Sequence, residues 1–173
     1  TGEVVYDAPE HTEVPGRIDE LIEQLREDRG VSAMVRGAMA HLNLVMIHPF
    51  RDGNGRMGRC LQTLVLAREQ ILEPTFCSIE EYLGRNTQAY YDVLADVGGG
   101  HWQPERDALP WVRFSLTAHY RQAQTYLRRI KESEQLWEEL ETLAATRALP
   151  ERSIPVLYDA ANGYRVRNAT YRA

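Results

Sequence analysis

The stretch His48-Pro-Phe-Arg-Asp-Gly-Asn-Gly-Arg-Met-Gly-Arg59 decides how the chain folds around it. Pro49 stops a regular helix at His48, because the residue before a proline is disfavoured in the α region. Gly53 and Gly55 then permit backbone conformations that side chains forbid, as a tight turn requires. We therefore expect two helices joined by a short loop that is crowded with polar groups.

Helical periodicity extends on both sides of this loop. Apolar residues three and four positions apart predict amphipathic helices over 17–29, 32–47, 56–70, 78–97, 110–131 and around 136–143. Ser78 and Glu81 form a capping box at the start of the fourth helix, and Gly98-Gly99-Gly100 indicates a turn after it. Val4-Val5-Tyr6 has the composition of a short strand. The expected fold class is all-α with a short β flap at the N-terminus.

The composition excludes several classes of protein. With 173 residues, of which 43% are hydrophobic, the chain can bury a real core as one domain or one domain plus a fragment. It has no run of about eighteen apolar residues, so no membrane span is expected. The net charge of −5 argues against general nucleic-acid binding, which needs a basic face. Cys60 and Cys77 have no metal-type spacing, which favours a reduced, cytoplasmic setting.

The composition changes at Arg147. From there to Ala173 the sequence has five arginines against two acidic residues. We expect residues 1–146 to form the main domain and residues 147–173 to be a linker and the beginning of a second unit. The start at Thr1 rather than Met suggests that an N-terminal segment has been removed.

The loop itself has the composition of an anion site. A glycine-rich turn that opens a helix presents backbone N–H groups and the positive end of the helix dipole. Gly53 and Gly55 let these amides converge, and Asn54 can add a side-chain donor. Arg56 and Arg59 lie on one helix face. Two guanidinium groups beside such amides suit a polyphosphate better than a single carboxylate.

Asp52 and His48 add reactive chemistry to this anion site. A carboxylate beside phosphates makes sense where a divalent cation lies between them, and Mg²⁺ commonly binds one carboxylate together with phosphate oxygens and waters. Histidine titrates near neutral pH, so His48 is placed to act as a general base on an incoming nucleophile. Together these residues predict a phosphate-transfer site.

Each of these residues also has a purely structural interpretation. His48 could face the negative end of its own helix dipole. Asp52 or Asn54 could be a helix N-cap, and Asp52 with Arg56 could be a surface ion pair. For His41, which lies on roughly the same helix face as His48, a core or surface role is a better explanation than a two-histidine metal site.

The loop resembles the signature of the Fic family, His-x-Phe-x-Asp/Glu-Gly-Asn-Gly-Arg-x-x-Arg, at every defined position. The resemblance extends from about Val4 to Arg128 and includes the tyrosine pair at 90–91. It implies a Fic-type helical bundle in which residues 1–146 are the catalytic core and 1–15 a remnant of the flap. It also implies that 147–173 are a linker and the truncated start of a winged-helix unit.

The resemblance implies protein adenylylation, the transfer of AMP from ATP to a hydroxyl group of a target protein. His48 would be the general base, and Asp52 would hold Mg²⁺ on the phosphates. Phe50 would be a buried anchor for the loop. Tyr91 would line the adenine pocket; the alternative is that Tyr90 and Tyr91 are both ordinary core or surface aromatics.

The remaining signature residues would bind the phosphates of ATP. By the resemblance, the α- and β-phosphates would be surrounded by Gly53, Asn54 and Gly55, and the β- and γ-phosphates held by Arg56 and Arg59. The kinase-like branch of the family has lysine in place of Gly55, and the phosphocholine-transferring variant has alanine in place of Gly53. AMP transfer is therefore preferred.

Three alternatives stay open. UMP or another nucleotide could be transferred, because Gly98-Gly99-Gly100 stands where some family members have a polar residue for the base. Water could be the acceptor, which would give nucleotide hydrolysis. The chain could also be a DNA-linked regulator in which the Fic core is a vestigial binding module.

The resemblance also implies partners. A target segment would dock as an added strand on the flap near Val4–Tyr6. Many Fic proteins are inhibited by a helix with the pattern Ser/Thr-x-x-x-Glu-Gly/Asn, which does not occur in this sequence. Three explanations stay open: a removed N-terminal segment or a separate antitoxin supplies a glutamate to Arg59, or the chain has no such control. DNA binding is expected only if a full winged-helix unit follows.

Overall fold

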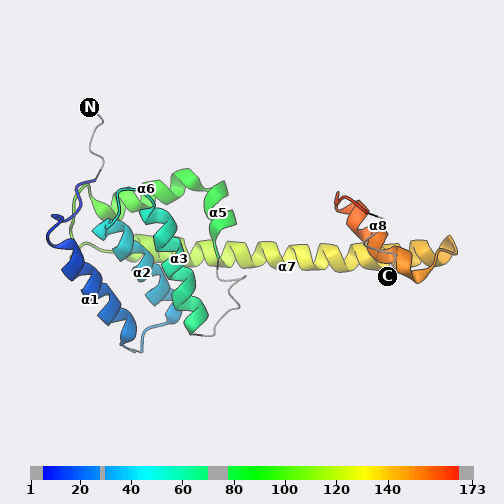
Figure 1. Ribbon diagram of the computed structural model, residues 1–173, viewed down its shortest axis with the longest axis horizontal. Coiled ribbons are helices and arrows are strands. Elements are labelled where there is room, and N and C mark those ends of the chain that lie inside the picture. The colour runs from blue at the N-terminus through cyan, green and yellow to red at the C-terminus, as the bar shows by residue number, and fades with distance from the viewer. Residues whose placement is uncertain (1–5, 28–29, 70–77, 168–173) are drawn as a thin grey trace. The chain divides into compact units, whose positions relative to one another are not determined.

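The computed structural model describes residues 6–27, 30–69 and 78–167. The chain divides into two units, residues 1–123 and 124–173, and the boundary falls within helix α7 (Leu109–Thr146). Before α7 the first unit contains α1 (Val14–Arg26), α2 (Ala33–Ile47), α3 (Asn54–Arg68), α5 (Glu80–Arg85) and α6 (Thr87–Gly98) (Figure 1). The described residues form no strand, so the predicted all-α class is confirmed.

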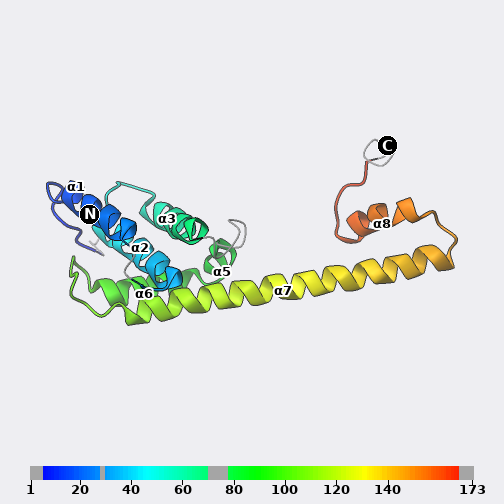
Figure 2. The same cartoon turned by 90° about the horizontal axis from the view of Figure 1, so that it is seen from below.

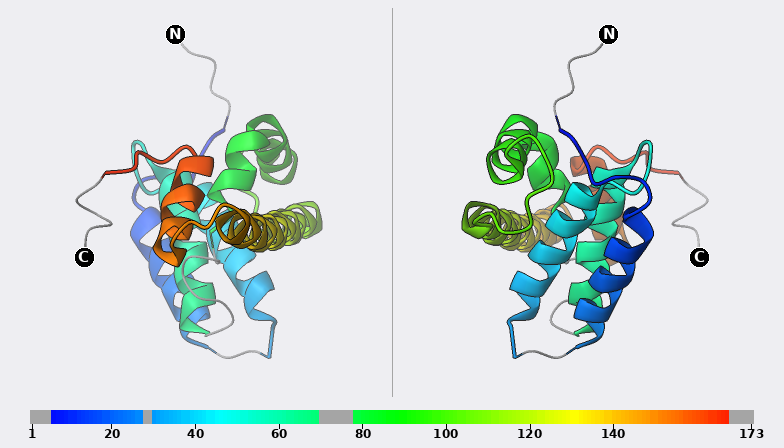
Figure 3. Two further views of the ribbon diagram at one scale, coloured as in Figure 1. Left: turned by 90° about the vertical axis from the view of Figure 1, so that its right-hand side faces the viewer. Right: turned by 90° about the vertical axis from the view of Figure 1, so that its left-hand side faces the viewer.

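Helices α1, α2 and α3 run side by side (Figures 1 and 3). Small residues bring α2 and α3 close together. A Cβ atom added to Gly58 would lie 2.5 Å from Cδ2 of His41, and one added to Gly37 would lie 3.4 Å from Cγ of Leu66. Because these glycines have no side chain, the two helices that flank the signature loop pack almost backbone to backbone.

A second layer covers the other side of α2. Helix α6 lies along the first turns of α7 (Figure 2), and the two share a core around Trp111. Trp111 is fully buried, and its Nε1–H donates a hydrogen bond of 2.7 Å to the carbonyl oxygen of Ala38 in α2. This bond ties α7 to the helix that ends at His48.

Two predicted helix patterns are wrong. The helix expected over 78–97 is divided into α5 and α6 at Asn86, whose φ of −127° lies outside the α region. Helix α5 begins at Glu80. In place of the expected capping box, the Ser78 hydroxyl oxygen accepts the N–H of Glu80 at 3.3 Å. Conversely, the helices expected over 110–131 and around 136–143 are one helix, because no Gly or Pro interrupts 111–146.

In the second unit, the last turns of α7 pack against helix α8 (Ile154–Ala161), which follows the short 3-10 helix η1 (Glu151–Ser153). The buried core of this unit consists of Leu140, Ala144 and Ile154. Part of the segment expected to be a linker and the start of a second unit is therefore helical. The start of a winged-helix unit here stays a prediction.

Most of the predicted flap, residues 1–5, lies outside the described residues, and so does Cys77. Asp7 forms an isolated parallel bridge with His101: its N–H donates to Gly100 O at 2.9 Å, and its oxygen accepts from Trp102 N at 3.0 Å. The expected glycine turn is confirmed, with Gly99 and Gly100 at φ 56° and 82°. None of the helices in the described ranges is long and apolar enough to cross a membrane.

Candidate active site

His48 ends α2 in a conformation that few residues adopt. Its φ and ψ are both 53°, in the left-handed region where a non-glycine residue is strained. Its ring is exposed and lies 6.5 Å from the ring of Tyr6, and its Nδ1 lies 3.3 Å from the carbonyl oxygen of Val45. The imidazole is therefore exposed and held against the end of α2 through one nitrogen.

The side chain of Asn54 fastens the loop. Its Oδ1 accepts the N–H of Phe50 at 2.9 Å, and its Nδ2 donates to the carbonyl oxygen of Phe50 at 2.7 Å. Asn54 is only 4% exposed, so the amide expected to donate to an anion instead holds the loop closed. The expectation that Phe50 is a buried anchor is wrong: its side chain is 45% exposed, and its backbone makes the anchoring contacts.

Gly53 begins α3 with a φ of 91°, which glycine alone adopts readily. The first helical hydrogen bond runs from Met57 N to Gly53 O at 2.9 Å. The N–H groups of Asn54, Gly55 and Arg56 precede it, as an anion site at a helix N-terminus requires.

Asp52 lies over this first turn. Its Oδ1 accepts the Gly53 N–H at 2.6 Å, and its Oδ2 accepts from Arg56 at 3.0 Å. The surface ion pair considered from the sequence is therefore present. Both side chains are largely exposed, so the pair is weak and its partners can separate.

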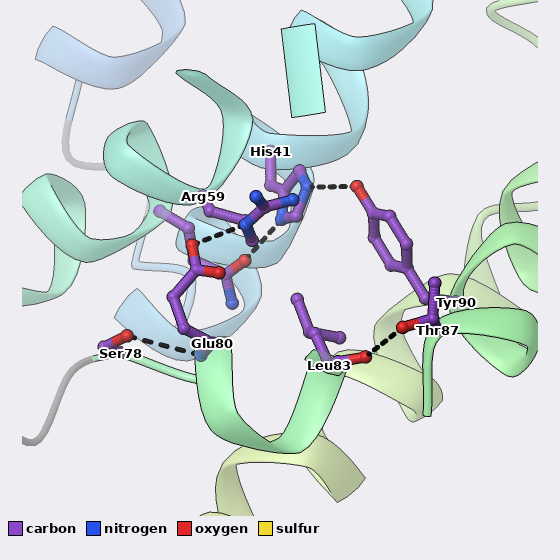
Figure 4. A network of polar contacts seen from close by, with 8 residues as sticks. His41, Arg59, Ser78, Glu80, Leu83, Thr87 and Tyr90 are labelled. Carbon is purple, nitrogen blue, oxygen red and sulfur yellow. Dashed lines mark hydrogen bonds and ion pairs between the residues drawn. The ribbon is translucent and has the colours of Figure 1, made fainter. Parts of the chain in front are cut away.

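Arg59 pairs with Glu80, a residue that the sequence did not single out. Its Nε donates to Oε1 of Glu80 at 2.5 Å (Figure 4). Burial disfavours the charged form of Arg59, but the hydrogen bond and charge of Glu80 outweigh it and raise the pKa of Arg59 above its usual value. The predicted glutamate partner from a removed segment or antitoxin stays a prediction.

The signature residues line one cavity of about 320 Å³. All eight predicted site residues are at its wall: His48, Asp52, Gly53, Asn54, Gly55, Arg56, Arg59 and Tyr91. The cavity is completed by Val45, Arg51, Tyr90 and Leu94. Residues 43 positions apart in the sequence are thus brought to a single site that combines a histidine, a carboxylate, amides and guanidinium groups.

The two neighbouring tyrosines have different environments. Tyr91 is 60% exposed, so its ring presents a face to the cavity, whereas Tyr90 is 4% exposed and packs against Trp111. The hydroxyl of Tyr90 lies 3.1 Å from Nε2 of His41, which is fully buried. His41 is therefore a core histidine, as the structural interpretation predicted.

Asp52 has the chemistry of a ligand for Mg²⁺. No group of three or more His, Cys, Asp or Glu side chains within the described ranges could hold a metal by itself. Asp52 offers one exposed carboxylate beside the amides and Arg56. This donor set fits Mg²⁺, which often takes a single carboxylate when phosphates and waters supply the other ligands.

Comparisons with known proteins point to one family. Residues 1–66 match the model of the Fic/DOC family. The chain is 30% identical over 129 residues to a protein adenylyltransferase of Caenorhabditis elegans, covering 73% of this chain and 22% of that protein. It is 37% identical over 90 residues to the protein adenylyltransferase Fic of Aedes aegypti, covering 52% of this chain and 16% of that protein.

A solved structure agrees with these sequence relatives. The chain superimposes on the crystal structure of a Fic family protein from Desulfovibrio desulfuricans G20 with a TM-score of 0.63 and 26% identity, covering 91% of this chain and 48% of that chain. The chain thus spans less than half of that structure and about a fifth of the two adenylyltransferases.

Proposed function

This chain belongs to the Fic/DOC family, and we propose that it is a protein adenylyltransferase that transfers AMP from ATP to a hydroxyl group of a target protein. One observation carries the proposal. A single cavity is lined by an exposed histidine, the N-terminus of a helix and two arginines. General base and phosphate site are the two parts that nucleotidyl transfer needs.

His48 is the proposed general base. When its Nδ1–H donates to Val45 O, the lone pair of Nε2 is left to take a proton. The hydroxyl oxygen of a Ser, Thr or Tyr of the target then attacks the α-phosphorus of ATP. The bond from this phosphorus to the bridging oxygen breaks, pyrophosphate leaves with the electron pair, and the proton stays on His48.

The first turn of α3 is the proposed phosphate site. Residues 53–55 would surround the α- and β-phosphates, where negative charge grows in the transition state. The N–H groups of Asn54 and Gly55 can face the phosphates directly, whereas the Gly53 N–H would first have to leave Asp52. Arg56 and Arg59 would hold the β- and γ-phosphates through charge-assisted hydrogen bonds. Arg56 would exchange its exposed pairing with Asp52 for a phosphate, which costs little because that pair is solvated.

Asp52 is the proposed ligand for Mg²⁺, which would neutralise the charge of the phosphates. Tyr91 is the proposed contact for the adenine ring, because an exposed aromatic ring at the wall offers a stacking face. Gly53 and Gly55 support transfer of AMP. An alanine in place of Gly53 is typical of the phosphocholine-transferring variant of the family, and a lysine in place of Gly55 is typical of its kinase-like branch.

Incubation with ATP labelled on the α-phosphate, Mg²⁺ and a cell lysate tests the proposal. Label should transfer to protein with the wild-type chain and not with His48→Asn, since asparagine tolerates the left-handed backbone but cannot act as the base. Parallel reactions with UTP identify the nucleotide. Free AMP without labelled protein would show hydrolysis, and tight DNA binding without any transfer would show a regulator; either result would refute the proposal.

A further inference from the structure

A chain of buried hydrogen bonds runs through the core of the first unit to Tyr90, beside Arg59. Gln62 of α3 is at its centre. The Nε2 of Gln62 contacts Ser115 Oγ at 3.0 Å and Nε2 of His119 at 2.8 Å, and its Oε1 lies 2.7 Å from Nδ1 of His41. Gln62, Ser115 and His41 are almost completely buried, so water does not compete for these bonds.

The partners of each group fix the direction of donation. An amide nitrogen has two N–H donors and no acceptor, so Gln62 donates to both Ser115 and His119. Its oxygen can only accept, so Nδ1 of His41 carries the proton that faces Gln62. Burial lowers the pKa of His41 and of His119 to about 4, so both rings are neutral near pH 7. Nε2 of His41 is therefore an acceptor, and the bond at 3.1 Å must be donated by the Tyr90 hydroxyl.

The hydroxyl of Tyr90 has only one proton, and His41 accepts it (Figure 4). The oxygen lone pairs of Tyr90 are left to face Arg59, whose positive charge opposes the rise that burial causes in the pKa of this hydroxyl. A Cβ atom on Gly55 would lie 3.4 Å from Nη1 of Arg59 and 3.5 Å from the hydroxyl oxygen of Tyr90, so both groups lie beside the same point of the first turn of α3.

We infer that Tyr90 is a positioning residue: the chain Gln62–His41–Tyr90 keeps its hydroxyl oxygen turned toward Arg59 and thereby orients the guanidinium toward the terminal phosphates of the nucleotide. The inference rests on the proposed function, because it needs a nucleotide in the cavity. It adds a specificity element to that function. A fixed Arg59 favours a nucleoside triphosphate over a monophosphate, which does not reach this arginine.

The direction of the chain can be tested in the wild-type protein. Long-range ¹H–¹⁵N spectra of the histidine rings at pH 7 should show His41 with its proton on Nδ1. A proton on Nε2 would mean that His41 donates to Tyr90, and the inference would be overturned. This measurement requires no substitution and is independent of whether the chain transfers AMP.

The role in binding is tested with Tyr90→Phe, which removes only the hydroxyl group. Isothermal titration calorimetry with Mg²⁺ should show ATP affinity reduced about tenfold, as expected for a hydrogen bond to a charged group, and AMP affinity nearly unchanged. Tyr82→Phe is the matched control, because Tyr82 is a part-buried tyrosine outside the cavity that packs on Phe114. It should change neither affinity.

The outcomes separate the two proposals. Equal loss of ATP and AMP affinity in Tyr90→Phe, no loss at all, or the same selective loss in Tyr82→Phe would overturn the positioning role alone. A wild-type chain that binds no ATP would overturn the proposed function and this inference together. Circular dichroism and thermal unfolding check that Tyr90→Phe is folded, and the histidine spectra decide the inference if it is not.

Discussion

Arg59 and Glu80 are held together at 2.5 Å, although 21 positions separate them in the sequence. The pair joins α3 to α5 and keeps a carboxylate beside an arginine that lines the cavity. A phosphate that approaches Arg59 must therefore compete with Glu80 or tolerate its charge.

Replacing Glu80 with Gln should strengthen ATP binding. The substitution removes the negative charge beside Arg59 and keeps the size of the side chain. Because Glu80 is 58% exposed, water weakens the repulsion, and we expect a gain of about threefold. Calorimetric titration with ATP measures it.

Glu81→Gln is the control for this prediction. It removes the same charge from the same turn, but Glu81 pairs with Arg85 and accepts a hydrogen bond from Gln122. Equal gains in both variants would show a general effect of net charge and would contradict a specific role of the Arg59–Glu80 pair.

His48→Gly should give a more stable protein than His48→Ala, by about 1 kcal/mol. Alanine keeps the strain of the left-handed backbone at φ 53°, and glycine relieves it. Both variants should lose transfer activity by about 10²- to 10⁴-fold, as removal of a general base does. Urea denaturation and the labelled-ATP assay check the two parts; an equally stable pair would show that the backbone at 48 is unstrained.

Gly58→Ala should destabilise the protein by about 1–3 kcal/mol, as overpacking of a core does. The added methyl group would meet Cδ2 of His41 at 2.5 Å and Cγ2 of Val45 at 3.0 Å. Gly84→Ala is the control: no atom lies within 4 Å of its added Cβ, and alanine is the better helix former, so stability should stay or rise by up to about 1 kcal/mol. Urea denaturation ranks the two variants.

Stability should fall when the solution is acidified from pH 6.5 to pH 4. Burial lowers the pKa of His41 and His119 from 6.5 to about 4, so in this range the unfolded chain binds protons that the native chain does not. Each histidine contributes up to about 1.4 kcal/mol per pH unit, and this contribution is fully present above pH 6.5.

Denaturant unfolding at several pH values measures this slope. His119→Gln should reduce this slope by the contribution of one titrating group. The side-chain oxygen of the new glutamine can still accept the hydrogen bond from Gln62, but it does not titrate in this range. An unchanged slope in His119→Gln would mean that His119 is not the source of the acid sensitivity.

Tyr91→Ala should lower ATP affinity by about tenfold, since base–aromatic stacking contributes about 1–3 kcal/mol. Its exposed ring contributes little to the core, so the free energy of unfolding should change by less than about 0.5 kcal/mol. Tyr164→Ala removes an equally exposed tyrosine from the second unit and should leave ATP affinity unchanged. Unchanged affinity in Tyr91→Ala would exclude it from the nucleotide site.

The fold class and the signature loop could be predicted because both depend on local pattern. Helical periodicity marks α2 and α3, and Pro49 and Gly53 mark the loop between them. The break at Asn86 could not be predicted, since the residue is compatible with a helix and its conformation depends on packing. The single long α7 could have been predicted from the absence of Gly and Pro over 111–146.

The contacts around the site could not be predicted from the sequence, because they depend on how the helices pack. Glu80 reaches Arg59 only because α5 folds back beside α3, and nothing in its sequence neighbourhood indicates that contact. Gln62, Ser115 and His119 are polar residues on amphipathic helices, where a solvent-facing position is the usual expectation. Gly58 lies within the signature stretch, but the sequence does not show that α3 approaches α2 most closely there, because that depends on His41 of α2.

The two hydrogen bonds between Asn54 and Phe50 affect how the protein degrades chemically during storage. An asparagine followed by glycine, as at 54–55, is the sequence most prone to deamidation, because the Gly amide nitrogen readily attacks the side-chain carbonyl carbon. In the folded chain the Asn54 amide is held on both sides and buried. Each excursion to the unfolded state removes that protection, and the aspartate that results would place a negative charge at the start of α3. Stored protein would therefore lose its anion site in proportion to the time it has spent unfolded.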